Sequence, residues 1–300
     1  MKLQSLIERA SQISSATVAV ASAADKEVLE AVSMALELNL AKFILFGHKD
    51  EMKTLINENV PHLLKHEDIT LKHVSSPKVA AEQAVKAVKT NEANALMKGN
   101  VATAVILKAV LNKEFGLRTG NVLSHVAVFE VPGMNRLVIL TDAAMNIQPT
   151  LEQKAQIVQN SVNIVKSIGI HMPKVAPIAA VEVINPAMEA TLDAAALTQM
   201  NRRGQIKDCL IDGPLALDNA ISMEAAKHKG ISGEVAGQAD ILLVPNIDTG
   251  NALYKSLVYF AQAKVGAVIA GAKVPIVLTS RADSSESKLH SLALAICSAQ

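Results

Sequence analysis

Residues Thr17 to Gly47 read TVAVASAADKEVLEAVSMALELNLAKFILFG, an order of residue types that points to a strand, a helix and a second strand. Thr17–Ala21 and Lys42–Gly47 are short apolar runs of the kind found in buried strands. Between them, Asp25 is a favourable N-cap for an amphipathic helix from Lys26 to Leu38. These residues therefore predict a βαβ unit and a parallel sheet.

The alternation of strands and helices continues along the chain. Ile69–Ser75 and Asn94–Lys98 are the next expected strands, and Pro77 begins the helix between them at a position where its missing N–H costs little. His125–Val131 and Arg136–Thr141 are so closely spaced that they predict an antiparallel hairpin. After a helix over about 151–169, further elements are expected at Val175–Val183, Asp208–Ile211, Ile241–Val244, Val265–Ala270 and Pro275–Thr279 (strands) and at Ser284–Ala299 (a helix).

Length and composition favour two α/β domains. Half of the 300 residues are hydrophobic, with no Trp, two Tyr and five Phe, so the core is aliphatic, as in buried parallel sheets. A single core stops growing beyond about 250 to 300 residues, which favours two lobes. No flexible linker is visible and the last helix can return to the first lobe. We therefore expect a discontinuous first domain, residues 1–140 plus 270–300, and a second domain at 141–269.

Charge and hydropathy exclude several classes of protein. Twenty-nine basic and twenty-eight acidic residues leave a net charge of +1, and no basic run is interleaved with aromatic residues, which argues against nucleic acid as a partner. Residues 1–21 are amphipathic, unlike a signal peptide, and no apolar run reaches the roughly 20 residues that cross a bilayer. Cys209 and Cys297 form no ligand or redox motif. We expect a cytoplasmic protein with reduced thiols and no membrane contact.

Polar residues follow the expected strands at five places. In open α/β sheets, ligands bind outside the carboxyl ends of the strands, so these places are the candidates for a site. They are Lys98-Gly99-Asn100, Thr141-Asp142, Asp212-Gly213-Pro214, Asn246-Ile247-Asp248-Thr249-Gly250-Asn251 and Ser280-Arg281-Ala282-Asp283.

Two of these segments precede helices in a way that suits an anion. Lys98 and Gly99 stand before a helix expected near Thr103, where a cation and free helix amides come together. A solvated lysine beside an ordinary turn explains these residues equally well. In the other segment, Asp248 or Thr249 is expected to cap a helix. The simpler alternative is a capped surface helix that binds no anion.

The segment from Ser280 to Asp283 presents a hydroxyl, a guanidinium and a carboxylate directly after an apolar strand. Arg281 can bind phosphate through two hydrogen bonds or stabilise an oxyanion. The alternative is that Ser280 or Asp283 only caps the last helix while Arg281 is solvated.

Motifs for metals, nucleotides and esterase chemistry are weak or absent. Asp142 and Asp212 are the candidate metal ligands, because strand-end carboxylates bind magnesium, although turn and cap roles are commoner. His125 is the one histidine that we place near a cleft. The sequence lacks G-x-G-x-x-G after its first strand and lacks G-x-S-x-G, and Gly266–Gly271 departs from a phosphate loop.

Four strings of residues, taken together, resemble the phosphotransacylase family. They occur in order across about 190 residues, and the Ser280–Asp283 ending is closer to the butyryl-transferring branch than to the acetyl-transferring branch. The strings are Ala95-Leu96-Met97-Lys98-Gly99, Asp212 to Asp218, Gly250-Asn251 with Tyr254-Lys255, and Pro275 to Arg281.

This resemblance implies the fold and the activity. It implies two α/β domains with mainly parallel sheets that flank a cleft, related to the isocitrate and isopropylmalate dehydrogenases, and a homodimer. It also implies reversible acyl transfer between coenzyme A and phosphate, with butyryl or branched short acyl groups preferred. Acyl-CoA and phosphate are then the substrates, and no cofactor is needed because coenzyme A is itself a substrate.

The same resemblance implies the site residues. Ser280 and Arg281 match a Ser-Arg pair of the acetyl-transferring relatives, whose catalytic aspartate falls on Ser287 here. Asp283 or Glu286 is therefore expected to act as the base, and we favour Asp283. No metal site is expected, and the substrate-binding residues are expected to be Lys98, Gly99, Asn100, His125, Gly250, Asn251, Tyr254 and Lys255.

Two other functions compete with this one. A metal- and NAD(P)-dependent decarboxylating dehydrogenase on the related fold needs clustered aspartates and several arginines, and the chain has only six arginines. A non-enzymatic two-lobed protein that closes on a small anion would bind a thioester without consuming it.

Overall fold

The computed structural model describes residues 1–13, 16–280 and 283–299. Contacts divide the chain into two compact units. One, the split unit, is formed by Leu3–Asn121 and Gly266–Gln300, and the other, the central unit, by Val122–Val265 with Met1–Lys2. Both combine a sheet with helices, so the prediction of an α/β fold is confirmed.

The strands of the split unit run in the order β3-β2-β1-β4-β11-β10. The first five are parallel, and β10 is antiparallel to β11. Val18, in the middle of the sheet, lies opposite Phe43 on one side and Ala95 on the other, and it is fully buried. The strands are β1 (Thr17–Ala21), β2 (Lys42–Gly47), β3 (Ile69–His73), β4 (Ala95–Lys98), β10 (Lys264–Ala270) and β11 (Ile276–Val277).

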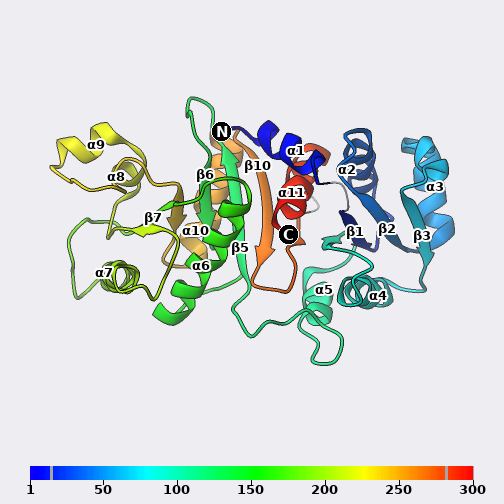
Figure 1. Ribbon diagram of the computed structural model, residues 1–300, viewed down its shortest axis with the longest axis horizontal. Coiled ribbons are helices and arrows are strands. Elements are labelled where there is room, and N and C mark those ends of the chain that lie inside the picture. The colour runs from blue at the N-terminus through cyan, green and yellow to red at the C-terminus, as the bar shows by residue number, and fades with distance from the viewer. Residues whose placement is uncertain (14–15, 281–282, 300) are drawn as a thin grey trace. The chain divides into compact units, whose positions relative to one another are not determined.

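Helices cover both faces of the split unit's sheet. In Figure 1, α4 and α5 lie below the strands, and α1, α2 and α11 lie above them. Local sequence sets where these helices begin: the Asp25 carboxylate accepts the Val28 amide at 3.1 Å, and Ser76 caps a helix whose first residue is Pro77. The helices are α1 (Leu3–Ser11), α2 (Lys26–Glu37), α3 (Lys49–Asn59), α4 (Pro77–Lys89), α5 (Thr103–Val110), α11 (Ser285–Ser298) and the 3₁₀ helix η1 (Pro61–Lys65).

The strands of the central unit run in the order β5-β6-β9-β7-β8. β5 and β6 are antiparallel, which confirms the predicted hairpin, and the other neighbours are parallel. The strands are β5 (Ser124–Glu130), β6 (Val138–Thr141), β7 (Lys174–Pro177), β8 (Leu210–Ile211) and β9 (Ile241–Leu243). The helices are α6 (Leu151–Ser167), α7 (Glu189–Arg202), α8 (Leu217–Ile221), α9 (Met223–His228), α10 (Ile247–Lys255) and the π-helical turn η2 (Ser256–Phe260).

Several predicted strands are shorter in the structure. The run Val175–Val183 ends as a strand at Pro177, and Pro275–Thr279 keeps only Ile276–Val277. Asp208 has a positive φ of 60°, so the strand expected from Asp208 begins only at Leu210. Apolar character alone predicted these runs, whereas strand pairing also requires a partner at every residue.

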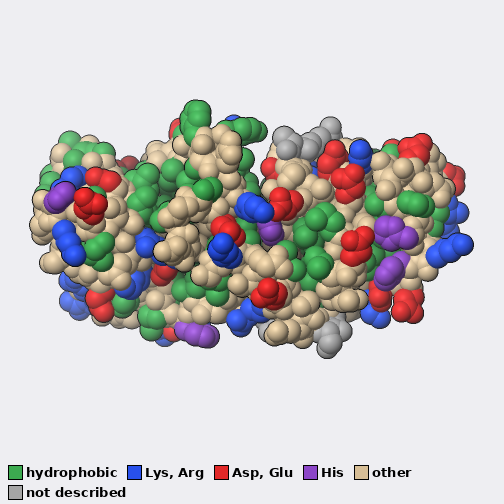
Figure 2. Space-filling model, turned by 90° about the horizontal axis from the view of Figure 1, so that it is seen from above, with side chains coloured by type: hydrophobic (Ala, Val, Ile, Leu, Met, Phe, Trp, Pro, Cys, Tyr) green, Lys and Arg blue, Asp and Glu red, His purple; other side chains and the backbone are tan. Residues whose placement is uncertain are grey.

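Among the described residues, no helix has the length and apolar character needed to span a bilayer. On the face drawn in Figure 2, basic and acidic side chains are interspersed rather than sorted by sign. This agrees with the balanced composition of the chain.

Candidate active site

Lys98 ends β4 and is buried, with 6% of its surface exposed. Its ammonium group donates to the carbonyl oxygens of Gly99 at 3.2 Å and Thr279 at 3.5 Å. The alternative of a solvated lysine is therefore wrong. Because Thr279 directly precedes Ser280, Lys98 connects two of the segments that the sequence singled out.

Gly99 and Asn100 pack against the residue that follows β1. The Gly99 amide donates to Ala21 and the Asn100 amide donates to Ser22, at 2.8 and 2.7 Å, while the Ser22 hydroxyl donates back to the Asn100 carbonyl at 3.0 Å. A Cβ atom on Gly99 would lie 2.2 Å from the Ser22 carbonyl oxygen. Only glycine fits here. Sequence reasoning missed Ser22, since a serine after a strand carries no distinctive signal.

Ser280 and Asp283 close a turn. The Ser280 amide donates to the Asp283 carboxylate at 2.7 Å, and the Asp283 amide donates to the Ser280 carbonyl at 3.2 Å. Neither residue caps the last helix, because Ser284 does so by accepting the Ser287 amide at 3.2 Å. Arg281, the third predicted catalytic residue, lies outside the described residues.

The other candidate for the base, Glu286, lies in the first turn of α11, as does Ser287, the position that matches the relatives' catalytic aspartate. Glu286 is the acidic residue of that turn, and the Ser287 hydroxyl is 3.2 Å from the Ser284 hydroxyl. The turn and the helix start thus bring Ser280, Asp283 and Glu286 into one short segment of the split unit.

In the central unit, Asp142 organises the segment that follows β6. Its carboxylate accepts the backbone amides of His125, Ala144, Met145 and Asn146 at 2.9 to 3.2 Å, and the Asn146 side-chain amide at 2.5 Å. Five donors occupy the oxygen lone pairs that a metal ion would need. The Asp142 carboxylate therefore has a structural role, and the suggestion that it binds magnesium is not supported by its contacts.

Helix α10 begins earlier than the sequence suggested. Its N-cap is Asn246, whose side chain accepts the Thr249 amide at 3.0 Å, so the prediction that Asp248 or Thr249 is the cap is wrong. Gly250 and Asn251 consequently lie inside the helix and not in a turn. Asn246 can act as the cap because an Asn side chain, like that of Asp or Thr, accepts a hydrogen bond from a free helix amide.

The inner side of α10 packs on the Asp142 segment and on β5. The Asn251 side chain donates to the Ala143 carbonyl at 3.4 Å, and a Cβ atom on Gly250 would lie 2.6 Å from the Asp142 carbonyl oxygen. The Tyr254 ring lies 5.8 Å from the His125 ring and 5.2 Å from the Phe129 ring. Four predicted binding residues, His125, Gly250, Asn251 and Tyr254, thus lie together, whereas Lys255 is exposed at the helix end.

Asp212 follows β8 in the central unit. Burial raises the pKa of its carboxyl group, and this is opposed by the charge of Arg202 and by the Gly213 amide. In the described part of the chain, no three His, Cys, Asp or Glu side chains gather as a metal site.

The two cysteines are poor nucleophiles. Burial is the main cause that raises the pKa of both Cys209 and Cys297 to about 11, so both remain thiols at neutral pH. Because the thiolate is the reactive form, neither is suited to covalent catalysis.

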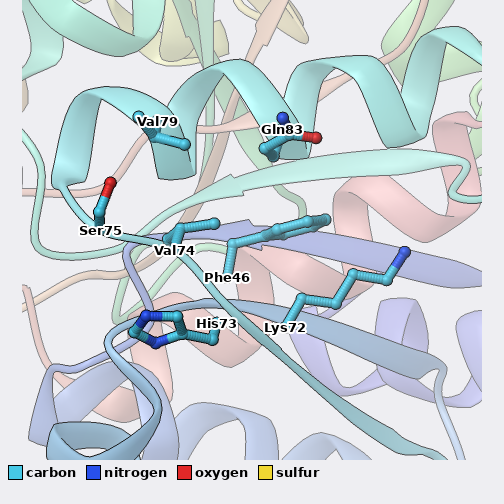
Figure 3. Close-up of a pocket in the computed structure, with 7 residues that line it drawn as sticks. All are labelled: Phe46, Lys72, His73, Val74, Ser75, Val79 and Gln83. Carbon is cyan, nitrogen blue, oxygen red and sulfur yellow. The ribbon is translucent and has the colours of Figure 1, made fainter.

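The split unit also contains a hollow of about 390 Å³ that none of the predicted site residues lines. Figure 3 shows Val79 and Gln83 of α4 above Phe46 and Val74, with His73 and Lys72 below. Lys72 forms an ion pair with Glu92 at 2.9 Å, so its charge is already compensated. We assign no function to this hollow.

Comparison with known proteins places these segments in a family context. The family described as Phosphate acetyl/butaryl transferase matches residues 56–296. The chain is 55% identical to the "Probable phosphate butyryltransferase" of Bacillus subtilis (strain 168), over 100% of this chain and 99% of that protein. It is 50% identical to the "Phosphate butyryltransferase" of Clostridium beijerinckii, over 97% of this chain and 95% of that protein.

The fold agrees with a solved structure. The crystal structure of a branched-chain phosphotransacylase from Enterococcus faecalis V583 superimposes with a TM-score of 0.83 and 40% identity, covering 95% of this chain and 99% of that one. Sequence and fold agree, and the chain belongs to the phosphate acetyl/butaryl transferase family.

Proposed function

We propose that this protein is a phosphate acyltransferase that catalyses butyryl-CoA + phosphate = butyryl phosphate + CoA in both directions. The observation that carries this proposal is the identity of 50% and 55% to two phosphate butyryltransferases over nearly the whole of both chains. The similarity to a branched-chain phosphotransacylase supports a preference for butyryl or branched short acyl groups. Neither rival function, dehydrogenase or anion-binding protein, has comparable support.

The reaction is an acyl substitution. In the direction that consumes butyryl phosphate, a base takes the thiol proton of coenzyme A and the thiolate attacks the acyl carbonyl. The C–S bond forms, a tetrahedral oxyanion is stabilised, and the C–O bond to phosphate then breaks. The base then passes its proton to the leaving phosphate or to solvent, so bonds and protons balance without an electron acceptor. We propose that no redox cofactor and no metal takes part and that coenzyme A is a substrate only.

In the split unit, we assign the chemical step to the Ser280–Asp283 segment. Ser280 donates a hydrogen bond to the oxyanion, Arg281 offsets negative charge on phosphate or the oxyanion, and Asp283 is the base. One oxygen of the Asp283 carboxylate accepts the Ser280 amide, which ties the base to the hydrogen-bond donor. We assign phosphate binding to Lys98, Gly99 and Asn100. The buried Lys98 ammonium group donates to the carbonyl of Thr279, the residue that precedes Ser280.

In the central unit, we assign binding of the coenzyme A thioester to the residues around α10. His125 and Tyr254 supply adjacent aromatic surfaces, and Asn251 and Lys255 supply polar groups on the same helix. Gly250 holds this helix close to the Asp142 segment.

We also propose a homodimer that works in the cytoplasm, on a fold related to the isocitrate and isopropylmalate dehydrogenases. The cytoplasm is supported by the two buried free cysteines, which suit a reducing compartment. Size-exclusion chromatography with light scattering tests the dimer, because a mass of one chain would contradict it.

Release of free coenzyme A is the test of the activity. Purified protein is mixed with acetyl-, butyryl- or isobutyryl-CoA and phosphate, with a chelator present and no nicotinamide. We expect phosphate-dependent release that is fastest with butyryl- or isobutyryl-CoA. Saturable binding without release would support the anion-binding protein, and release that needs a divalent metal would contradict the metal-free mechanism.

Replacement of Arg281 by alanine tests the catalytic segment. We expect kcat/KM to fall at least tenfold, about 1.4 kcal/mol in transition-state stabilisation, because a guanidinium that offsets developing charge is lost. Arg203→Ala is the control, since Arg203 is exposed at the end of α7. An Arg281→Ala enzyme within a few fold of the unmodified enzyme would rule out this role.

A further inference from the structure

Lys288 is a buried cation that sequence reasoning did not single out. It is the fourth residue of α11 and only 3% of its surface is exposed. Its ammonium group donates to the Ser280 carbonyl at 3.4 Å and, at shorter range, to the Asp283 carbonyl. Within the described residues, Lys288 forms no ion pair with a carboxylate, so these two carbonyl groups are what compensates the buried charge.

This pattern of contacts differs from that of the other lysine that is equally buried. Lys154 is also 3% exposed, but its ammonium group pairs with the Asp193 carboxylate at 2.6 Å. A buried charge is costly unless it is paired or hydrogen-bonded. Lys154 meets this need with a carboxylate, whereas Lys288 meets it with main-chain oxygens at the two ends of one turn.

The turn held by Lys288 is the one that carries the proposed catalytic residues. Its ends are already joined by the bond from the Ser280 amide to the Asp283 carboxylate and by the bond from the Asp283 amide to the Ser280 carbonyl. These bonds join Ser280 and Asp283 to each other but not to the rest of the unit. Lys288 adds the connection to α11, while Lys98 holds the preceding carbonyl, that of Thr279.

We propose that Lys288 is a positioning residue for acyl transfer, whose ammonium group fixes the Ser280–Asp283 turn against α11. The inference rests on the proposed function, and it adds a residue that acts through the turn without touching substrate. Because the turn carries the groups assigned to the chemical step, its displacement affects kcat more than substrate binding.

The test compares Lys288→Met with Lys154→Met. Met has a similar length but no charge and no N–H donor, so Lys288→Met leaves two neutral carbonyls without their donor. Lys154→Met leaves the Asp193 carboxylate, whose side chain is 13% exposed, without its cation. We expect Lys154→Met to lower the Tm more and keep kcat within about twofold. We expect Lys288→Met to lower the Tm less than Lys154→Met does. We expect it to lower kcat at least tenfold, about 1.4 kcal/mol in activation free energy, and to change KM for phosphate and butyryl-CoA by no more than about threefold.

Amide hydrogen exchange provides a readout that does not depend on activity. In Lys288→Met we expect faster exchange of the Ser280 and Asp283 amides, with the amides of 290–297 in α11 unchanged. If Lys288→Met does not fold, Lys288→Leu, which likewise has no charge and no N–H donor, carries the same expectations.

Two results would overturn the inference. One is a folded variant with kcat within about twofold of the unmodified enzyme, and the other is unchanged exchange at Ser280 and Asp283. A failure of the proposed function is distinct from these, because then the unmodified protein releases no coenzyme A while the exchange experiment still reports on the turn.

Discussion

Gly99→Ala is expected to lower kcat/KM for butyryl-CoA at least 100-fold, about 2.7 kcal/mol, and also to lower the Tm. The added Cβ would lie 2.2 Å from the Ser22 carbonyl oxygen and 2.9 Å from that of Ala21. Both contacts are with backbone, so the main chain has to move. That movement breaks the hydrogen bonds that the Gly99 and Asn100 amides make to Ala21 and Ser22.

The loss of activity follows because Lys98 precedes Gly99 directly. Displacing Gly99 shifts the ammonium group of Lys98 away from the carbonyl of Thr279, the residue that precedes Ser280. Steady-state kinetics and thermal unfolding of the same preparation measure both effects.

Gly47→Ala is the matched control for this prediction. Gly47 ends β2 in the same unit, and the nearest atom to its added Cβ is the Met52 sulfur at 3.0 Å, the end of a flexible side chain. We expect it to change activity by less than about threefold, since a flexible side chain relaxes more easily than backbone. Equal effects of the two substitutions would contradict the steric argument.

Asp142→Ala is expected to destabilise the protein by about 4 kcal/mol. A buried donor left without a partner costs about 1 to 3 kcal/mol, and this change leaves five donors, of which those near the surface regain water. The hydrogen bond from the His125 amide to Asp142 is buried, whereas the other four are partly buried. Urea unfolding followed by circular dichroism measures the difference in unfolding free energy.

Glu92→Ala is the control for Asp142→Ala. The Glu92 carboxylate also accepts a hydrogen bond, from the Lys72 ammonium group at 2.9 Å, but its side chain is 51% exposed. Ion pairs at the surface add little to stability, so the urea midpoint should stay close to that of the unmodified protein. A similarly small effect of Asp142→Ala would show that the five hydrogen bonds are replaced by water at little cost.

Local sequence was sufficient for much of the fold. The bounds of β1 and β2 are those predicted, because a short apolar run is buried as a strand and ends where polar turn residues begin. Asp25 and Pro77 mark helix starts as expected, since caps act within one helical turn. The prediction of the family from four short strings was confirmed by the match over residues 56–296.

The site was predicted less completely, because its contacts join residues far apart in the chain. The sequence around Lys98 also fits a solvated lysine, because its partner, the Thr279 carbonyl, lies 181 residues away in the chain. The assignment of catalytic and binding roles stays a prediction, and Arg281 lies outside the described residues.

What the sequence by itself determined was the order of strands and helices, the hairpin, the early helix caps and the family, all of which depend on periodicity or on neighbours within a few residues. The tertiary structure decided which side chains are buried and with what partner. Lys288 illustrates this, because only the tertiary structure places the Ser280 and Asp283 carbonyl groups at its charge. Asp142 is a second case, since four of its five donors are main-chain amides whose positions no side-chain pattern records.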